Sequence, residues 1–247
     1  MPKEEKGGSE MKKMKKMLAA VLTGGMILSL AACGSGGEDS GESKGEKKDS
    51  DIEGTSGFIG VDNMKYGYEI GKNAADWIKE NFKESDEVKV GVCNYPDYPF
   101  LVTREEGILK ALEELAPNAK VVVSAKAGYT PEGVDVGDAW VQSNPDLNVV
   151  VGINDAGVLG VYETFNAAGI NGDKLGMFGG DAVDDALAAL KEGGTFRGTV
   201  STEMLPNAHQ FIDMAVELAE KGKVEERELY FPMKTITTDT VDEFMAE

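Results

Sequence analysis

The stretch from residue 148 to residue 181 reads NVVVGINDAGVLGVYETFNAAGINGDKLGMFGGD and indicates the fold class. It begins with a short apolar run at 148–151 and closes with a second run at 175–179. Between the two runs, apolar residues over 156–168 follow the spacing of an α-helix. Near-continuous apolar strands joined by such a helix are typical of a parallel sheet that is covered on both faces.

The alternation of strand and helix continues on both sides of this unit. Further strands are predicted at 57–61, 88–93, 119–124 and 196–200, and further helices at 64–83, 102–116, 134–144, 182–192 and 206–222. The last helix carries an apolar stripe at helical spacing, formed by Ala208, Phe211, Ile212, Ala215, Leu218 and Ala219. We therefore predict an α/β fold with a doubly wound, mainly parallel sheet.

Composition excludes several classes of function. The formal charge is -19, with 44 acidic against 25 basic residues, and an acidic surface repels nucleic-acid phosphates. The two cysteines, Cys33 and Cys93, are too few for a disulfide framework. His209 is the only histidine, so a catalytic triad or a zinc site lacks its usual partners. We expect no nucleic-acid partner, no metal ion and no cofactor.

The N-terminal region has the pattern of an export signal. Residues 11–16 read MKKMKK, and residues 17–32 form an apolar run without charges that is too short to span a bilayer. The run ends in L-A-A-C-G at Cys33, which resembles the bacterial lipobox, in which the cysteine is lipidated and becomes the N-terminus. We predict a signal peptide at 11–32, with residues 1–10 as an over-called start. The alternative is an uncleaved anchor helix.

Residues 33–50 have the composition of a flexible acidic tether. They contain no large apolar residue, so they cannot bury enough surface to offset the entropy of ordering. The folded part is then expected at 51–247. Together with lipid on Cys33, this organisation predicts a protein that is anchored to the membrane on its extracytoplasmic face.

Four side chains are expected at one edge of the sheet, because ligands of such folds bind beyond the carboxyl ends of the strands. They are Arg104, Tyr129, Asn154 and Asp181. Amides, carboxylates and guanidinium groups bond hydroxyl groups, and an aromatic ring packs against the C–H face of a sugar. Taken singly, Asp181 also fits a helix cap, Asn154 a turn residue, Arg104 a solvated charge and Tyr129 a loop aromatic. Together they predict a sugar site.

Six short motifs occur in order along the folded part. They are G-V-D-N at 60–63, T-R-E-E-G-I at 103–108, N-P-D-L at 144–147, I-N-D-A at 153–156, G-G-D at 179–181 and G-T-V at 198–200. In this order and spacing they resemble the periplasmic sugar-binding proteins of the ribose/galactose type, which are the substrate-binding components of ABC transporters. The resemblance implies a lobe of the type I periplasmic binding protein fold.

The resemblance also implies roles for single residues. Arg104, Asn154 and Asp181 fall on positions that bond sugar hydroxyls, and Tyr129 falls on the position of the ring-stacking aromatic. A further polar ligand, often Gln, follows G-T-V in the family, and Glu203 is the candidate here. The D-S-D at 49–51 resembles the final strand of the family's first lobe, which makes Asp49 a candidate ligand as well.

The family has two lobes with the sugar between them, and the sequence that would form the first lobe is not found here. We therefore expect signal, tether and second lobe with its crossover segments, and the helix at 206–222 would have lost the lobe on which it packs. The predicted function is delivery of a sugar or polyol to the permease of an ABC importer, impaired by the missing lobe.

Two other classes of function stay open. A degenerate surface or interaction lipoprotein would share the same fold without binding a solute. An α/β lipoprotein enzyme would need a nucleophile with a nearby base, and no such pair is apparent in the sequence. We predict that the protein is not an enzyme.

Overall fold

The computed structural model describes residues 54–246. The predictions for the over-called start, the signal peptide, the tether, Cys33 and Asp49 therefore lie outside the described residues.

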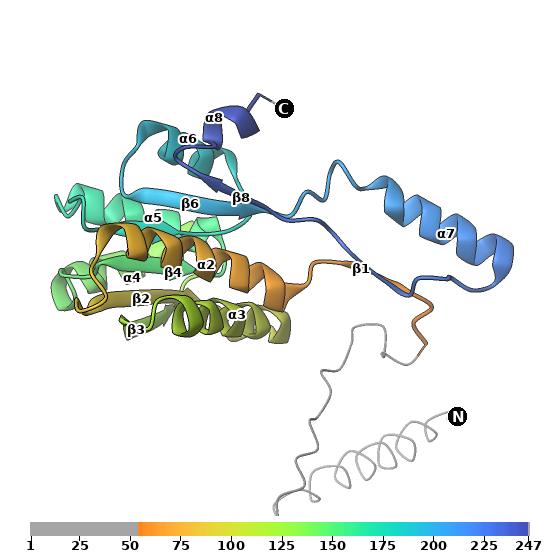
Figure 1. Ribbon diagram of the computed structural model, residues 1–247, viewed down its shortest axis with the longest axis horizontal. Helices are drawn as coiled ribbons and strands as arrows, with labels where there is room; N and C mark the ends of the chain where they lie inside the picture. The colour runs from red at the N-terminus through yellow and green to blue at the C-terminus, as the bar shows by residue number, and fades with distance from the viewer. Residues whose placement is uncertain (1–53, 247) are drawn as a thin grey trace, which may run out of the picture. The chain divides into compact units, whose positions relative to one another are not determined.

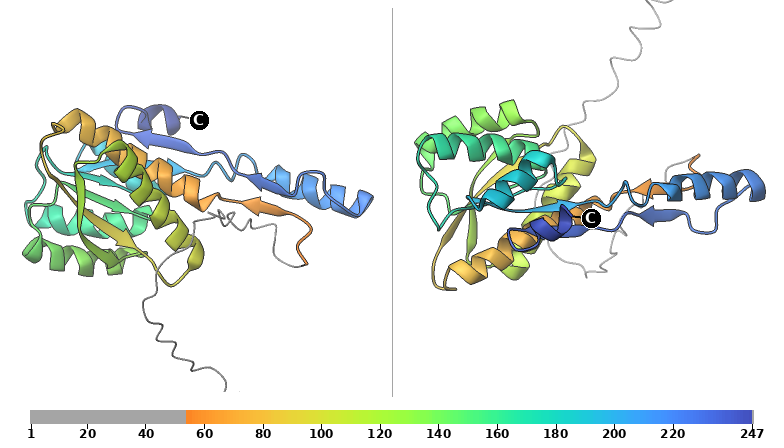
Figure 2. Two further views of the ribbon diagram at one scale, coloured as in Figure 1. Left: turned by 60° about the horizontal axis from the view of Figure 1, so that its bottom comes forward. Right: turned by 90° about the horizontal axis from the view of Figure 1, so that it is seen from above.

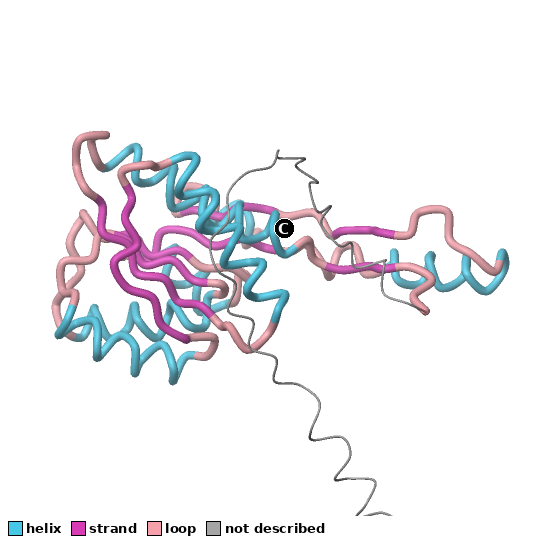
Figure 3. The backbone as a smooth tube through the Cα atoms, turned by 90° about the horizontal axis from the view of Figure 1, so that it is seen from below, coloured by secondary structure: helices cyan, strands magenta, loops and turns pink. Residues whose placement is uncertain are grey.

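A six-stranded sheet forms the centre of this part (Figure 1, Figure 3). In spatial order its strands are β3 (Ala119–Lys126), β2 (Val88–Asn94), β4 (Val149–Gly152), β5 (Gly176–Phe178), β6 (Phe196–Ser201) and β8 (Lys234–Thr237). All neighbouring pairs are parallel except β6 and β8, which are antiparallel. The predicted α/β class with a mainly parallel sheet is confirmed.

Helices cover both faces of the sheet (Figure 2). One face packs on α2 (Asn63–Asn81) and α3 (Pro99–Leu115). The other face packs on α4 (Thr130–Ser143), α5 (Asp155–Ala167), α6 (Asp184–Glu192) and the short α8 (Val241–Phe244). Burial on both faces explains why the central strands are near-continuous apolar runs.

Successive residues of the central strands belong alternately to the two hydrophobic cores, one on each face of the sheet. Val90 and Val92 of β2 belong to the core under α2 and α3, whereas Cys93 belongs to the core under α4 and α5. Cys93 is fully buried, and burial raises the pKa of its thiol to about 12. It is the small core residue that its strand position predicts.

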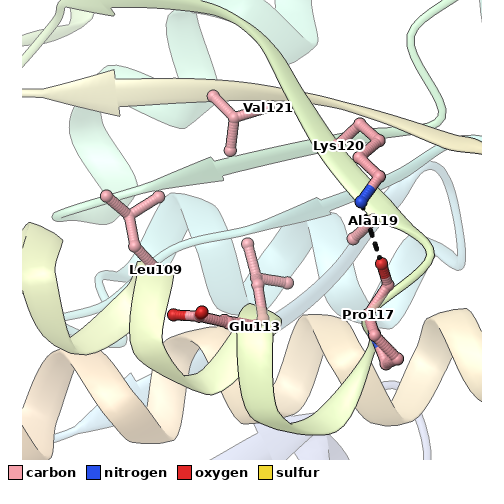
Figure 4. A pocket seen from close by; sticks show the side chains of 7 residues that line it. Leu109, Glu113, Pro117, Ala119, Lys120 and Val121 are labelled. Atoms are coloured by element: carbon pink, nitrogen blue, oxygen red, sulfur yellow. Dashed lines mark hydrogen bonds between the residues drawn. The ribbon is translucent and has the colours of Figure 1, made fainter.

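The edge strand β3 contains a bulge. Val121 pairs with Val90 and Val123 pairs with Gly91, which leaves Val122 as the extra residue. Val121 and Leu109 of α3 line a hollow of about 340 Å³, as Figure 4 shows. A bulge and flanking lysines are common protection for an open sheet edge, and Lys120 is exposed here.

One predicted strand lies elsewhere. The strand predicted at 57–61 was expected in the main sheet. In the structure, β1 (Phe58–Gly60) instead pairs in parallel with β7 (Glu228–Tyr230) in a separate two-stranded sheet. No residue range was predicted for β7, β8 or α8. Each is three or four residues long, so none carries enough repeats to show a period.

The apolar stripe of helix α7 (His209–Lys221) is only partly covered. No residue of α7 is buried, and Phe211 and Ile212 are 44% and 65% exposed. In Figure 1 and Figure 2, α7 lies with β1 and β7 and away from the six-stranded sheet. Phe211 and Leu218 of the stripe line an open groove together with Ile59 and Val224, so part of the stripe is covered.

Phe211→Asp is expected to reduce self-association of the protein, since it places a charge in an exposed apolar stripe. The cost in unfolding free energy should stay below about 1 kcal/mol, because the side chain is already partly exposed. Sedimentation velocity over a concentration series and denaturant unfolding measure the two effects. Val122→Asp, at an exposed apolar site on β3, is the matched control and should leave association unchanged. A Phe211→Asp variant that is already unfolded in buffer without denaturant would contradict the expectation.

Candidate ligand-binding site

The carboxyl ends of β2, β4, β5 and β6 lie side by side at one edge of the sheet. Asn154 follows β4, and Asp181 follows β5, the next strand in the sheet. Arg104 reaches the same edge from α3, since it bonds the backbone of Ile153 at the end of β4. The structure therefore brings these three predicted residues together.

Arg104 is held in place on three sides and is only 9% exposed. Its Nε and Nη2 donate to Oδ1 of Asn63, over 3.1 and 2.9 Å. Its Nη1 donates to the carbonyl oxygen of Ile153 over 2.8 Å. The guanidinium carbon lies 4.4 Å from the centre of the Tyr66 ring, in cation–π contact. The orientation of the guanidinium group is thus set before any ligand arrives.

Asp181 faces Arg104 and remains open to solvent. Its Oδ1 is 3.8 Å from Nη1 of Arg104, and the side chain is 43% exposed. Partial burial raises the pKa of Asp181, while the positive charge of Arg104 and the hydroxyl of Tyr66 act in the opposite direction. A guanidinium donor and a carboxylate acceptor so placed can bond neighbouring hydroxyl groups of one ligand.

Tyr66 and Asn63 complete this cluster. Asn63 closes the G-V-D-N motif at 60–63, but neither residue was given a role from the sequence. Tyr66 is fully buried, and its hydroxyl donates to the carbonyl oxygen of Val200 over 2.7 Å and lies 3.1 Å from Oδ1 of Asp181. Burial raises the pKa of Tyr66 well above its ordinary value. The signal for both residues was their spacing of three at the start of α2, which places them on one helix face.

Two glycines let α2 and α3 approach closely enough for Arg104 to reach Asn63. A methyl group at Gly67 would overlap the carbonyl oxygen of Arg104, and one at Gly107 would overlap that of Met64. The helix–helix contact is therefore made backbone to backbone at this level.

Asn154 is the N-cap of α5. Its Oδ1 accepts from the amide of Gly157 over 3.1 Å, and its Nδ2 donates to the carbonyl oxygen of Gly128 over 2.8 Å. The sequence left only a turn role open for Asn154 as an alternative to ligand binding, and the structure gives it the role of a helix cap. One N–H and one lone pair of the amide are left for a ligand.

Tyr129 is 58% exposed on the rim after β3. Its ring meets the ring of Tyr95 edge to face, at 5.8 Å and 88°. Tyr95 is nearly buried and also stacks on Tyr98, with 5.8 Å between ring centres. Because Gly128 packs against Tyr95 and bonds Asn154, this aromatic group borders the polar cluster.

Glu203 is not joined to the cluster. Its carbonyl oxygen accepts from Nδ2 of Asn207, and its amide donates to Oγ of Ser201. Within residues 54–246, no hydrogen bond or ion pair links its side chain to Arg104 or Asp181.

The same range of residues shows no metal-site geometry. No group of three or more histidine, cysteine, aspartate or glutamate side chains in 54–246 is arranged to hold a metal ion. None of the helices described is both long and apolar enough to cross a bilayer. The chemistry of the cluster is hydrogen bonding by fixed donors and acceptors.

Residues 47–223 match the protein family described as periplasmic binding protein domain. The ABC transporter periplasmic-binding protein YphF of Escherichia coli K12 is 26% identical over 148 residues, which are 59% of this chain and 43% of that protein. A putative rhizopine-binding protein of Rhizobium meliloti is 30% identical over 116 residues, 47% of this chain and 37% of that protein. The chain thus spans less than half the length of these curated relatives.

Solved structures show the same fold. A periplasmic solute-binding protein of Actinobacillus succinogenes 130z with bound D-allose superposes with a TM-score of 0.67 at 23% identity, over 76% of this chain and 63% of that one. A periplasmic ribose ABC transporter protein of Conexibacter woesei DSM 14684 gives a TM-score of 0.67 at 25% identity, over 78% and 63%.

Proposed function

The chain belongs to the periplasmic binding protein domain family, and we propose on this basis that it binds a sugar or related polyol for the permease of an ABC importer. The observation that carries the proposal is the fixed pair of Arg104 and Asp181 beside Asn154 at the carboxyl edge of the sheet. Solute-binding proteins form a family without catalysis of their own, which supports a non-enzymatic role.

The proposed contacts follow from the hydrogen-bond donors and acceptors of the cluster that can still bond a ligand. Asp181 offers carboxylate oxygens to hydroxyl groups, Arg104 offers N–H groups, and Asn154 offers one of each kind. Tyr129 offers an exposed ring for the C–H face of the ligand. Glu203 and Asp49 are proposed ligands on the resemblance alone.

We expect weak binding by the chain acting alone, because it presents one wall of the proposed site. A micromolar dissociation constant corresponds to about -8 kcal/mol, and each tenfold loss of affinity costs only ~1.4 kcal/mol. We therefore expect dissociation constants at or beyond ~1 mM. Saturation-transfer NMR and calorimetry with D-allose, D-ribose, D-galactose and myo-inositol measure this, with L-leucine as the negative control. Micromolar affinity would contradict the one-wall expectation.

A degenerate surface or interaction lipoprotein is the second candidate. The exposed apolar residues of α7, among them Ile212 and Val216, favour it, since exposed apolar patches often mark contacts with other proteins. Absence of saturation transfer from every polyol at saturating concentration would reject the solute-binding proposal and favour this one.

Membrane attachment through Cys33 is a separate part of the proposal. Cys33→Ser is expected to move the protein from the membrane fraction to the soluble fraction and to remove its lipid mass, since a lipid anchor supplies the binding energy for the bilayer. Cell fractionation with mass spectrometry measures both. Cys93→Ser, at the buried cysteine, is the matched control and should stay membrane-bound. Equal partitioning of wild type and Cys33→Ser, both unlipidated, would reject the anchor.

A further inference from the structure

Asp155 is a buried carboxylate that directly follows Asn154. Its side chain is excluded from solvent and accepts from Oγ1 of Thr199 over 2.8 and 2.9 Å. Its Oδ2 also accepts from the amide of Val183 over 3.1 Å. Its own amide donates to the carbonyl oxygen of Gly180 over 2.6 Å. Asp155 therefore bonds both ends of the turn that carries Asp181.

This turn has an unfavourable backbone conformation. Asp181 has a φ of 107° and Ala182 a φ of 53°, which is the region that favours glycine. Such residues keep this conformation only where the surroundings enforce it. Here the amide of Ala182 donates to Oγ1 of Thr199 over 3.2 Å. Thr199 therefore connects Asp155 to the centre of the turn, because the same hydroxyl donates to the Asp155 carboxylate.

Burying a carboxylate is costly unless its bonds are satisfied. Burial raises the pKa of Asp155 well above its ordinary value, and the bonds from Thr199 and Val183 act against that rise. The polar contacts of its side chain are to the turn and to Thr199, which itself contacts the turn. The hydrogen bonds of the Asp155 carboxylate therefore mainly stabilise the conformation of residues 180–183.

We propose that Asp155 is a positioning residue: with Thr199 it enforces the left-handed turn at 181–182 and so presents Asp181 to Arg104 and to the ligand. This inference rests on the proposed function for its meaning, but its geometry does not depend on a sugar. Three successive residues then organise the site, since Ile153 bonds Arg104, Asn154 bonds Gly128, and Asp155 bonds the turn.

The test is hydrogen exchange of the turn amides in the full chain with Asp155→Asn. The amide of Asp181 is the decisive probe, because it donates to Val200 over 2.8 Å and makes no bond to Asp155. If Asp155 only satisfies its own partners, the amide of Val183 alone will exchange faster. If it enforces the turn, the amide of Asp181 will exchange at least about tenfold faster, relative to the amide of Met177 in β5.

Two further variants keep the test decisive. Asp185→Asn removes an exposed carboxylate from the first turn of α6 and should leave the amide of Asp181 unchanged. If Asp155→Asn does not fold, Thr199→Val is judged by the same criterion. An exchange rate of Asp181 within about twofold of wild type overturns the proposal. Loss of folding in both variants also overturns it, because the pair would then support the whole domain and not the turn.

Binding of D-allose and myo-inositol by the same variants separates this inference from the proposed function. Faster exchange at Asp181 together with weaker binding supports both. Faster exchange at Asp181 in Asp155→Asn, combined with a wild-type protein that binds neither probe, supports the positioning role and rejects the solute-binding proposal. Unchanged exchange rejects the positioning role whatever the binding.

Discussion

Arg104→Ala is expected to lower the free energy of unfolding by about 3 kcal/mol and to abolish the remaining affinity for sugars. The substitution leaves Oδ1 of Asn63 and the carbonyl oxygen of Ile153 without their donor. It also removes the positive charge that faces Asp181 at 3.8 Å. Both effects follow from one cause, because the group that would bond the ligand is also the group that joins α3 to α2 and β4.

Denaturant unfolding and saturation-transfer NMR measure the two losses separately. Lys110→Ala is the matched control, since Lys110 is an exposed cation on the same helix and should change neither quantity appreciably. Arg104→Lys should recover little, because an ammonium group cannot bond Asn63 in a fork and Ile153 at once. If Arg104→Ala unfolds at the same midpoint denaturant concentration as wild type, the hydrogen bonds of Arg104 contribute little to the free energy of unfolding.

Gly67→Ala is expected to destabilise the protein by about 3 kcal/mol, at the upper end for an overpacked site. The added methyl group would meet the backbone carbonyl of Arg104, which cannot rotate away as a side chain can. The two helices must separate, and Arg104 then loses its reach to Asn63. We therefore expect weaker sugar binding even in conditions where the variant is fully folded.

Gly172→Ala is the matched control for this substitution. Nothing lies within 4 Å of the position that its methyl group would occupy, so its effect should stay within about 0.5 kcal/mol. Thermal unfolding of the two variants side by side measures the difference. Equal melting temperatures would mean that α2 and α3 can part without cost and that their contact does not set the site.

Much of the fold was predictable because its signal is local. Apolar periodicity over 88–93, 148–151 and 196–200 identified strands that the structure contains, with ends shifted by no more than one residue. The helix at 206–222 was also found as a helix with an exposed stripe, although α7 begins at His209. The missed elements are short, and β1 was assigned to the wrong sheet because pairing partners leave no trace in local spacing.

The sequence by itself determined the order of strands and helices and which side chains follow each strand. That sufficed to predict that Arg104, Asn154 and Asp181 share one edge, because the carboxyl ends of parallel strands meet there. Only the tertiary structure decided how those side chains are held. Asn63 holds Arg104 across 41 positions of sequence, and Asp155 bonds Thr199 across 44. Such contacts depend on how closely two helices approach and on how a turn is strained, and both are set by packing between segments that a local pattern cannot relate.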